Sequence, residues 1–177
     1  MFLQDRAWAV LRTSLFATVF IALFVVYLPW TWAIRGQAVG YEGLGSLRLL
    51  AIMPLIAGAY IALRCAFAFA WTGLGTPAPF DPPRNLIISG FYRYVRNPMY
   101  FGAALVVIGE TALFGSIRAG LQYVLIFSGC LALFVLIYEE PTLRSKFGSE
   151  YEEYCRNVSR FIPHLTPWEN ARHSTAK

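Results

Sequence analysis

The chain has 177 residues, of which 57% are hydrophobic and only 14% are charged, with a net charge of +5. A soluble domain of this size would carry about a quarter charged residues, so the composition excludes an ordinary soluble domain and indicates one integral membrane domain. The positive charge does not indicate a nucleic-acid partner, because the basic residues form no dense run and nearly all are arginines. The cysteines and histidines show no metal-ligand spacing, so no metal site is expected.

Four apolar runs predict an all-α membrane bundle of about four transmembrane helices. The runs extend from about residue 8 to 34, 47 to 71, 99 to 114 and 121 to 138. A spanning helix needs roughly 20 apolar residues and at least about 17. The first two runs exceed this limit, and the third is marginal and contains Glu110. Because only residues 115–120 separate the last two runs, these should form a tight antiparallel hairpin.

The basic residues predict the orientation of the bundle. With four spans, the N-terminus, the second connection and the C-terminal segment lie on one side. That side would hold most of the 15 basic residues, whereas only Arg35, Arg48 and Arg118 fall on the other. By the positive-inside rule, both termini should face the cytoplasm. Arg64 lies late in the second run, and its side chain is expected to point toward the same, cytoplasmic side.

The second connection, from Gly73 to Asn97, is long and irregular. Its glycines and prolines exclude a regular helix through most of its length. A loop this long in a compact membrane protein is more often functional than idle, although a loose cytosolic loop is the alternative. The aromatic residues Phe91, Tyr92 and Tyr94 favour a packed structure.

The segment after the fourth run predicts an amphipathic cytosolic helix. Its apolar residues recur at steps of three or four, which places them on one helix face: Leu143, Phe147, Tyr151, Tyr154 and Val158. This helix should lie on the membrane surface or fold back over the cytosolic ends of the spans. We therefore expect a single domain, 1–177, that consists of two N-terminal spans (1–72), a core (73–163) and a tail (164–177). The tail is expected to be disordered from Asn170 onward.

Arg96, Asn97 and Pro98 predict the start of the third helix. Asn is favoured at the N-cap and Pro at the first helical position. A helix N-terminus carries free N–H donors and partial positive charge, so with Arg93 and Arg96 beside it this is a potential anion site. The alternative is a capped helix whose arginines contact lipid phosphates.

Glu139 and Glu140, at the end of the fourth run, should need partners. Their candidates are Arg64, Arg93, Arg96 or the cation of a ligand, and a structural salt bridge is the alternative to a binding role. The hairpin brings the glutamates close to the basic start of the third helix, so the two groups could hold a zwitterionic, amino-acid-like cofactor. Glu110, within the third run, could line a substrate cavity or pair with Arg64.

Two blocks of sequence resemble a known family. The stretch from Ser89 to Gly102 is similar to the signature of the isoprenylcysteine carboxyl methyltransferase and phospholipid methyltransferase superfamily. A second block matches in order and spacing: Glu139-Glu140, Leu143, Phe147-Gly148, Tyr151, Tyr154, Val158, Arg160 and Pro163. The resemblance covers residues 73–163, and it implies an integral membrane enzyme that uses S-adenosylmethionine.

The resemblance also implies which residues form the site. Those that would bind the cofactor are Tyr92, Arg93, Arg96, Asn97, Pro98, Tyr100, Glu139, Glu140 and Tyr151. Glu140, Tyr154 and Arg160 are candidates to orient the acceptor nucleophile. The chain departs from the family pattern at Asn97, where the family usually has His, and Asn cannot take up a proton near neutral pH. Any acid–base role of that His therefore does not transfer.

Several functions remain open on the sequence. The acceptor could be a prenylated cysteine carboxylate, a lipid amine or a small lipophilic thiol or acid. The small size suggests a prokaryotic inner or plasma membrane protein, for which prenylated protein substrates are not expected. The rival enzyme is a membrane reductase of steroid 5α-reductase-like architecture that uses NADPH, and a non-enzymatic membrane adaptor is the second rival.

Overall fold

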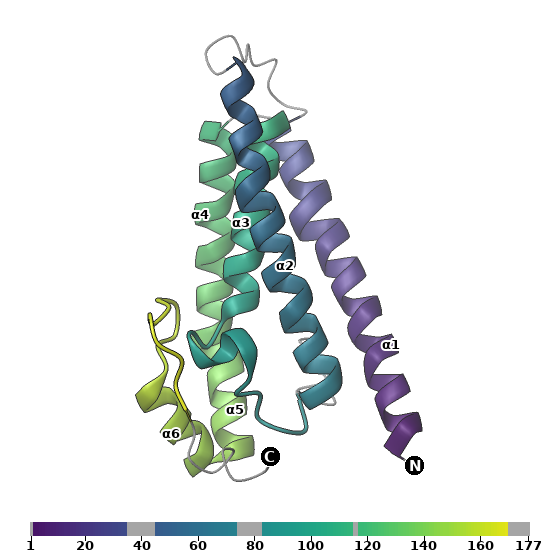
Figure 1. The fold of residues 1–177 in the computed structure, drawn as a ribbon, viewed down its shortest axis with the longest axis vertical. Coiled ribbons are helices and arrows are strands. Elements are labelled where there is room, and N and C mark those ends of the chain that lie inside the picture. The colour runs from purple at the N-terminus through teal and green to yellow at the C-terminus, as the bar shows by residue number, and fades with distance from the viewer. Residues whose placement is uncertain (1, 35–44, 74–82, 115–116, 170–177) are drawn as a thin grey trace.

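The computed structural model describes residues 2–34, 45–73, 83–114 and 117–169, and its regular elements are all helical. The four long helices, α1 to α4, run along the molecule (Figure 1). Their α-helical parts are α1 (Phe2–Phe20), α2 (Ile52–Ala68), α3 (Pro98–Phe114) and α4 (Ile117–Phe134). Two shorter helices follow, α5 (Glu140–Phe147) and α6 (Ser149–Asn157). The predictions for Arg35 and for the tail from Asn170 lie outside the described residues.

Turns of other helical types extend three of the long helices. The π-helical turns η1 (Ile21–Tyr27) and η2 (Trp30–Ile34) prolong α1. The 3-10 turn η3 (Gly45–Ala51) precedes α2, and the π turn η4 (Phe69–Gly73) follows it. The π turn η6 (Val135–Glu139) joins α4 to α5 without a break, and a short 3-10 turn, η5 (Gly90–Arg93), lies in the second connection.

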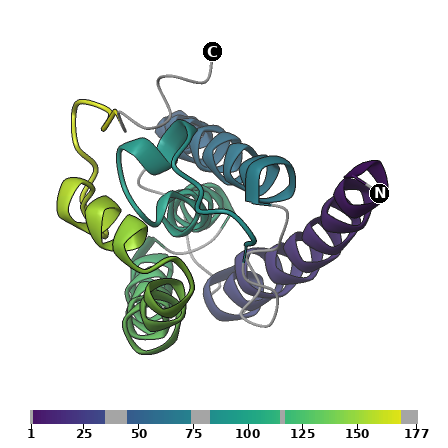
Figure 2. The ribbon, with the colours of Figure 1, turned by 90° about the horizontal axis from the view of Figure 1, so that it is seen from below.

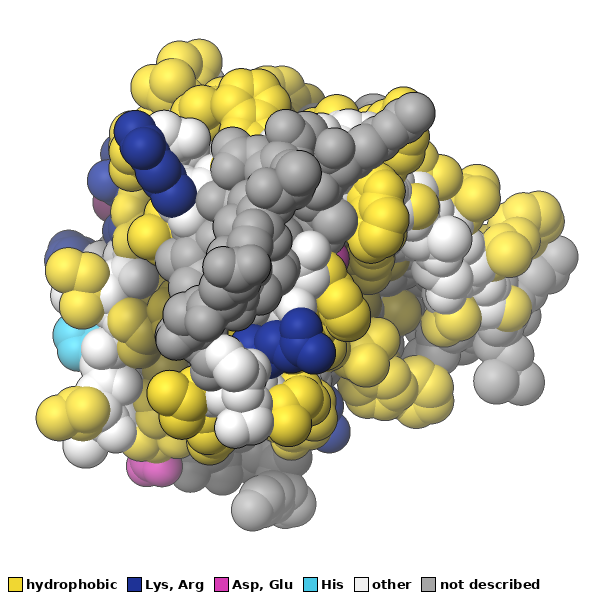
Figure 3. All heavy atoms as spheres, turned by 90° about the horizontal axis from the view of Figure 1, so that it is seen from above, with side chains coloured by type: hydrophobic (Ala, Val, Ile, Leu, Met, Phe, Trp, Pro, Cys, Tyr) yellow, Lys and Arg dark blue, Asp and Glu magenta, His cyan; other side chains and the backbone are white. Residues whose placement is uncertain are grey.

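Among the described residues, three helical stretches are long and apolar enough to cross a membrane. They cover Val10–Trp32, Gly45–Gly73 and Arg118–Phe147. The third predicted span, α3, is equally apolar but has only 17 residues. At about 1.5 Å per residue it is about 25 Å long, somewhat less than the ~30 Å hydrocarbon core of a bilayer. The surface agrees with a lipid environment, because apolar side chains surround the end of the bundle in Figure 3.

Helix α3 occupies the centre of the bundle, with α1, α2 and α4 around it (Figure 2). Small residues allow α2 and α3 to approach closely, as is common between helices in membranes. Gly58 of α2 faces the backbone of Gly102, and Gly109 of α3 faces the backbone of Ala51 and Leu55. This contact fixes the start of α3, and with it the residues around Pro98, relative to the end of α2.

The Gly58→Ala variant tests this packing. A Cβ at position 58 would press into the carbonyl oxygen of Gly102 and lie 2.8 Å from the Cβ of Leu105. We expect it to lower the free energy of unfolding by about 1–3 kcal/mol, the usual cost of overpacking. Gly129→Ala is the matched control, because its Cβ would meet nothing within 4 Å. Thermal unfolding in detergent measures both variants, and equal midpoints for the two would contradict the packing.

The C-terminal half corrects two predictions. The fourth helix does not end near Tyr138 but continues through both glutamates to Phe147. The predicted single amphipathic helix is also divided, because Gly148 has a φ of +52° that L-residues rarely adopt. The chain turns there, and α6 folds back toward the second connection. Its apolar residues nevertheless cluster as the pattern indicates, with Tyr151 and Tyr154 buried against Leu86.

Candidate functional site

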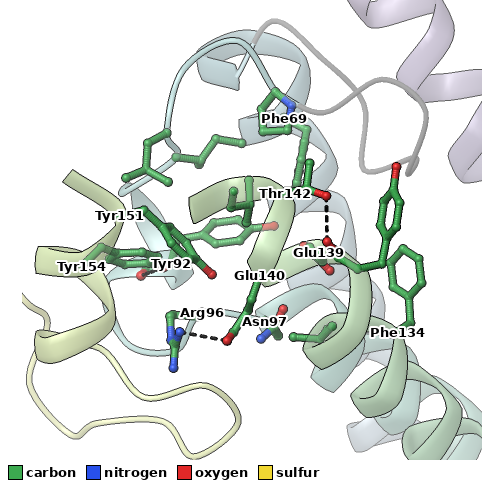
Figure 4. A pocket seen from close by; sticks show the side chains of 16 residues that line it. Phe69, Tyr92, Arg96, Asn97, Phe134, Glu139, Glu140, Thr142, Tyr151 and Tyr154 are labelled. Atoms are coloured by element: carbon green, nitrogen blue, oxygen red, sulfur yellow. Dashed lines mark hydrogen bonds and ion pairs between the residues drawn. The ribbon is translucent and has the colours of Figure 1, made fainter. Parts of the chain in front are cut away.

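A cavity opens at the end of the bundle where α3 begins and η6 ends (Figure 4). The space within it is about 730 Å³, open solvent at its mouth included. Its walls come from η4, the second connection, the start of α3, the η6–α5 junction and α6. The cavity gathers seven of the residues singled out in the sequence: Tyr92, Arg96, Asn97, Glu139, Glu140, Tyr151 and Tyr154.

Three of the four remaining predicted site residues lie around this cavity. Tyr100 lines a smaller space beside it, together with Arg96 and Glu139. Pro98 is buried at the first position of α3, as the sequence predicts. Arg160 reaches Glu140 from the C-terminal segment. Arg93 lies apart, where its guanidinium donates to the carbonyl oxygen of Trp168 and to Glu169.

Glu140 is held by two arginines. The Nε and Nη2 of Arg160 donate to its two carboxylate oxygens at 2.6 and 2.8 Å, and the Nη1 of Arg96 donates to Oε1 at 2.8 Å. The Glu140 side chain is only 6% exposed and that of Arg96 10%. The hydrogen bonds to Glu140 raise the pKa of the Arg160 guanidinium above its ordinary value, so Arg160 stays positively charged. Arg160 is a partner of Glu140 that the sequence did not indicate.

The Nε–H of Arg96 is left without a hydrogen-bond acceptor among the described residues, although the atom is buried. The Nη1 of the same side chain also contacts the Sγ of Cys155 at 2.8 Å, and the backbone N–H donates to the carbonyl of Ser159. The guanidinium is therefore fixed in place while its buried Nε–H is unused. An unused buried donor costs free energy, and a carboxylate of a ligand would satisfy it.

Glu139 differs from its neighbour because it has no arginine or lysine partner in the described part of the chain. The hydroxyl of Tyr100 donates to its Oε2 at 3.0 Å, and this is the contact that holds the side chain. A carboxylate at this depth usually has a cation nearby. Glu139 and the Nε–H of Arg96 thus offer one acceptor for a cation and one donor for an anion on the wall of the same cavity.

The π turn η6 sets the directions of the two glutamates. Pro141 follows them and lacks the N–H that would bond the carbonyl four residues earlier, so a regular α-helix is disturbed here. The helix continues through one wider turn instead, and the hydroxyl of Thr142 donates to the carbonyl of Tyr138 at 2.7 Å. Glu140 consequently faces the arginines, and Glu139 faces Tyr100 of α3.

The C-terminal segment closes over the second connection. The Tyr154 hydroxyl donates to the carbonyl of Tyr92 at 2.7 Å, and the Asn97 side-chain amide donates to the carbonyl of Arg160 at 3.0 Å. Burial raises the pKa of Tyr92 and of Tyr154 well above the usual range, so both hydroxyls stay protonated. These bonds position α6 and the segment after it as one wall of the cavity.

Apolar residues complete the cavity and were not predicted. Phe69, Phe134 and Val135 line it, and Val135 is fully buried. Phe134 and Tyr138 stack one helical turn apart, directly before the glutamates. The i,i+4 spacing of this aromatic pair could have indicated in the sequence that both rings lie on one face near the glutamates. Phe69, at the end of α2, lies in the cavity only because of the tertiary packing. The predicted Glu110–Arg64 pair does not form, since Glu110 has a buried oxygen without a partner in the described chain.

Comparisons with known proteins support the family resemblance found in the sequence. A family model described as phospholipid methyltransferase matches residues 47–150, more than half of the chain. A probable protein-S-isoprenylcysteine O-methyltransferase of Oryza sativa subsp. japonica is 29% identical over 86 residues, which is 49% of this chain and 44% of that protein. The protein-S-isoprenylcysteine O-methyltransferase of Schizosaccharomyces pombe is 33% identical over 78 residues, 44% of this chain and 33% of that protein.

A reductase also shows similarity. The Delta(14)-sterol reductase TM7SF2 of Mus musculus is 26% identical over 161 residues, which cover 80% of this chain and 37% of that protein. The chain therefore spans less than half of the length of the curated relatives it matches. No solved structure shows significant similarity to it.

Proposed function

Because the chain belongs to the phospholipid methyltransferase family, we propose that it is an integral membrane enzyme that transfers a methyl group from S-adenosylmethionine to a lipophilic acceptor. The observation that carries this proposal is that one cavity is lined both by an unsatisfied donor and by a carboxylate that has no arginine or lysine partner among the described residues. The buried Nε–H of Arg96 suits a carboxylate, and Glu139 suits a cation. The methionine part of the cofactor carries a carboxylate, an ammonium and a sulfonium.

The chain's own residues would bind and align the reactants rather than move protons. When bound, S-adenosylmethionine supplies a methyl group on a sulfonium, which is a good leaving group. Arg96 and Glu139 would hold the charged part, while Phe69, Phe134 and Val135 keep water from that side of the cavity. Alignment and desolvation can then supply most of the rate enhancement. Asn97, which cannot act as a base, is compatible with this role because its amide ties α3 to the C-terminal segment.

Glu140, Tyr154 and Arg160 are proposed to orient the acceptor by fixing the cavity wall. Both carboxylate oxygens of Glu140 accept hydrogen bonds from arginines, and the Tyr154 hydroxyl already donates its hydrogen bond to the carbonyl of Tyr92. Tyr92, Tyr100 and Tyr151 would enclose the cofactor, with Pro98 placing the start of α3. Arg93 is the predicted cofactor ligand that this geometry supports least, because it lines a different cavity.

We propose a single domain with four spans, in which α3 is a short central span shielded by its neighbours. The cavity end carries Arg84, Arg144 and Arg156 besides the site arginines, whereas the described residues of the opposite end carry Arg48 and Arg118. By the positive-inside rule the cavity faces the cytoplasm, and the acceptor enters from the bilayer. The relatives' names make an isoprenylcysteine carboxylate one candidate acceptor, beside a lipid amine or a small lipophilic thiol or acid.

A membrane reductase that uses NADPH is the second candidate. The similarity to the sterol reductase covers 80% of the chain, which favours a shared architecture. Calorimetric titration of the purified protein with S-adenosylmethionine, its demethylated product and NADPH separates the two. Binding of S-adenosylmethionine without binding of NADPH supports the methyltransferase, and binding of NADPH alone overturns it.

The Glu139→Gln variant tests the cation side of the cavity. It keeps the size of the side chain and an oxygen for the Tyr100 hydroxyl but removes the negative charge. We expect the Kd for S-adenosylmethionine to rise about 10- to 100-fold, or about 1.4–2.8 kcal/mol, measured by calorimetry. Tyr100→Phe is the control, since it removes the hydrogen bond and leaves the charge. An equal loss in both variants would assign the effect to the hydrogen bond instead.

A further inference from the structure

A second cavity lies on the α2 side of Tyr92. The space within it is about 930 Å³, open solvent included, and it is bounded by the second half of α2 and by η5. It contains two cationic side chains, Arg64 and Arg93, and none of the Asp or Glu residues that the structure describes lines it. Hydroxyl groups of Tyr60, Thr72, Ser89 and Tyr94 belong to the same lining. A basic cavity with several hydroxyl donors suits an oxyanion.

Of the described residues that line this cavity, Arg64 is the unpaired cation. Its side chain is exposed, and in the described part of the chain it makes no ion pair or side-chain hydrogen bond. Arg93, in contrast, is already neutralised by Glu169 at 3.1 Å. A ligand with about one negative charge would therefore balance the charge of this cavity, and its anionic group would lie at Arg64.

The depth of Arg64 places this charge at the level of lipid phosphates. The helical stretch Gly45–Gly73 has 29 residues, so it is about 43 Å long and extends beyond a ~30 Å hydrocarbon core by about 6–7 Å at each end. Arg64 lies nine residues before Gly73, about 13 Å along the helix and thus about 7 Å inside the core. An unpaired arginine at that depth is costly, and its long side chain reaches the boundary by snorkelling.

The wall between the two cavities keeps this site apart from the candidate cofactor site. Tyr92 lines both cavities and is only 7% exposed, and Cys65, which lines the second cavity and is 1% exposed, belongs to the same buried cluster. A headgroup at Arg64 is therefore not the group that would meet the cofactor. Tyr60 and Phe91 pack edge to face with ring centroids 6.0 Å apart, which gives the cavity an apolar side for the glycerol and the first acyl carbons.

We propose that this second cavity binds the phosphate of one anionic phospholipid, held by Arg64, as a resident lipid and not as the methyl acceptor. An anionic headgroup matches the one unpaired positive charge that the described lining residues provide, whereas a zwitterionic headgroup would bring a cation into a cavity that is already basic. Because Tyr92 lines both cavities, the bound lipid stabilises the wall behind the cofactor site. A ligand that binds only the folded protein raises its unfolding midpoint.

Native mass spectrometry of the delipidated protein, supplied with phosphatidylglycerol or phosphatidylcholine, tests this proposal. We expect one retained phosphatidylglycerol per chain in preference to phosphatidylcholine, and about tenfold weaker retention in Arg64→Gln. Arg84→Gln is the matched control, because Arg84 is an exposed arginine beside Gly73 and outside the cavity. It should retain the lipid as the unchanged protein does. Arg64→Lys, which keeps the charge, should retain most of it.

The thermal midpoint gives a second readout. Phosphatidylglycerol should raise the midpoint of the unchanged protein and of Arg84→Gln but not that of Arg64→Gln, and circular dichroism checks that each variant is folded. Equal retention of the two lipids, or equal losses in Arg64→Gln and Arg84→Gln, would show that the arginines only contact bulk lipid and would overturn the proposal. Neither readout uses S-adenosylmethionine, so the outcome is independent of the proposed methyl transfer.

Discussion

Arg96→Ala is expected to raise the Kd for S-adenosylmethionine about 100-fold while the protein stays folded. The loss reflects the charged donor that faces the cavity, because a hydrogen bond between charged groups contributes about 1.5–3 kcal/mol. The fold should survive, since Glu140 keeps both of its bonds to Arg160 when Arg96 is removed. Calorimetry measures the affinity, and the unfolding midpoint in detergent checks the fold.

Two further variants separate the charge of Arg96 from the geometry of its guanidinium. Arg96→Lys keeps the positive charge but has no Nε–H, and we expect about a tenfold loss of affinity. Arg144→Ala is the control, because Arg144 lies at the same end of the bundle but pairs with the exposed Glu152. This variant should leave the affinity for S-adenosylmethionine unchanged. An unaltered Kd in Arg96→Ala would remove this residue from the cofactor site.

The sequence predicted the start of α3 and brought its arginines close to the two glutamates, with Arg96 as one of three candidate arginine partners, because both depend on local signals. Asn97-Pro98 is a start signal for a helix, and a short connection between two apolar runs leaves only an antiparallel hairpin. The arginine of one helix start and the glutamate of the next helix end must then lie at the same end of the bundle. The ion pair at 2.8 Å follows from that topology.

The features that the sequence did not predict depend on the tertiary structure. The prediction that the fourth helix ends near Tyr138 rests on the end of the apolar run, and nothing near Pro141 indicates that a π turn continues the helix through it. Gly148 could be recognised as a break only once its positive φ was known. Arg160 lies 20 residues beyond Glu140, and no periodicity links the two, because the chain between them reverses direction at Gly148.

Removal of Glu140 should destabilise the fold more than removal of either arginine. In Glu140→Ala, Arg96 loses its counter-ion while its side chain is 10% exposed, and Arg160 loses both of its bonds. An uncompensated buried charge of this kind costs about 3–5 kcal/mol. Arg160→Ala should cost less, because Arg160 is 34% exposed and Glu140 retains Arg96. Thermal or denaturant unfolding in detergent measures these differences.

The double variant Glu140→Ala/Arg160→Ala decides whether this pair is a structural clamp. If Glu140 mainly compensates its arginines, removal of Arg160 takes away one of the two unpaired charges, and the double variant should be less destabilised than the sum of the single variants, with a coupling of about 1–3 kcal/mol. Additive effects would mean that Glu140 acts on something other than Arg160. Because Arg160 comes from the C-terminal segment that covers Tyr94 and Asn97, a positive coupling would also assign the closure of the cavity to this ion pair.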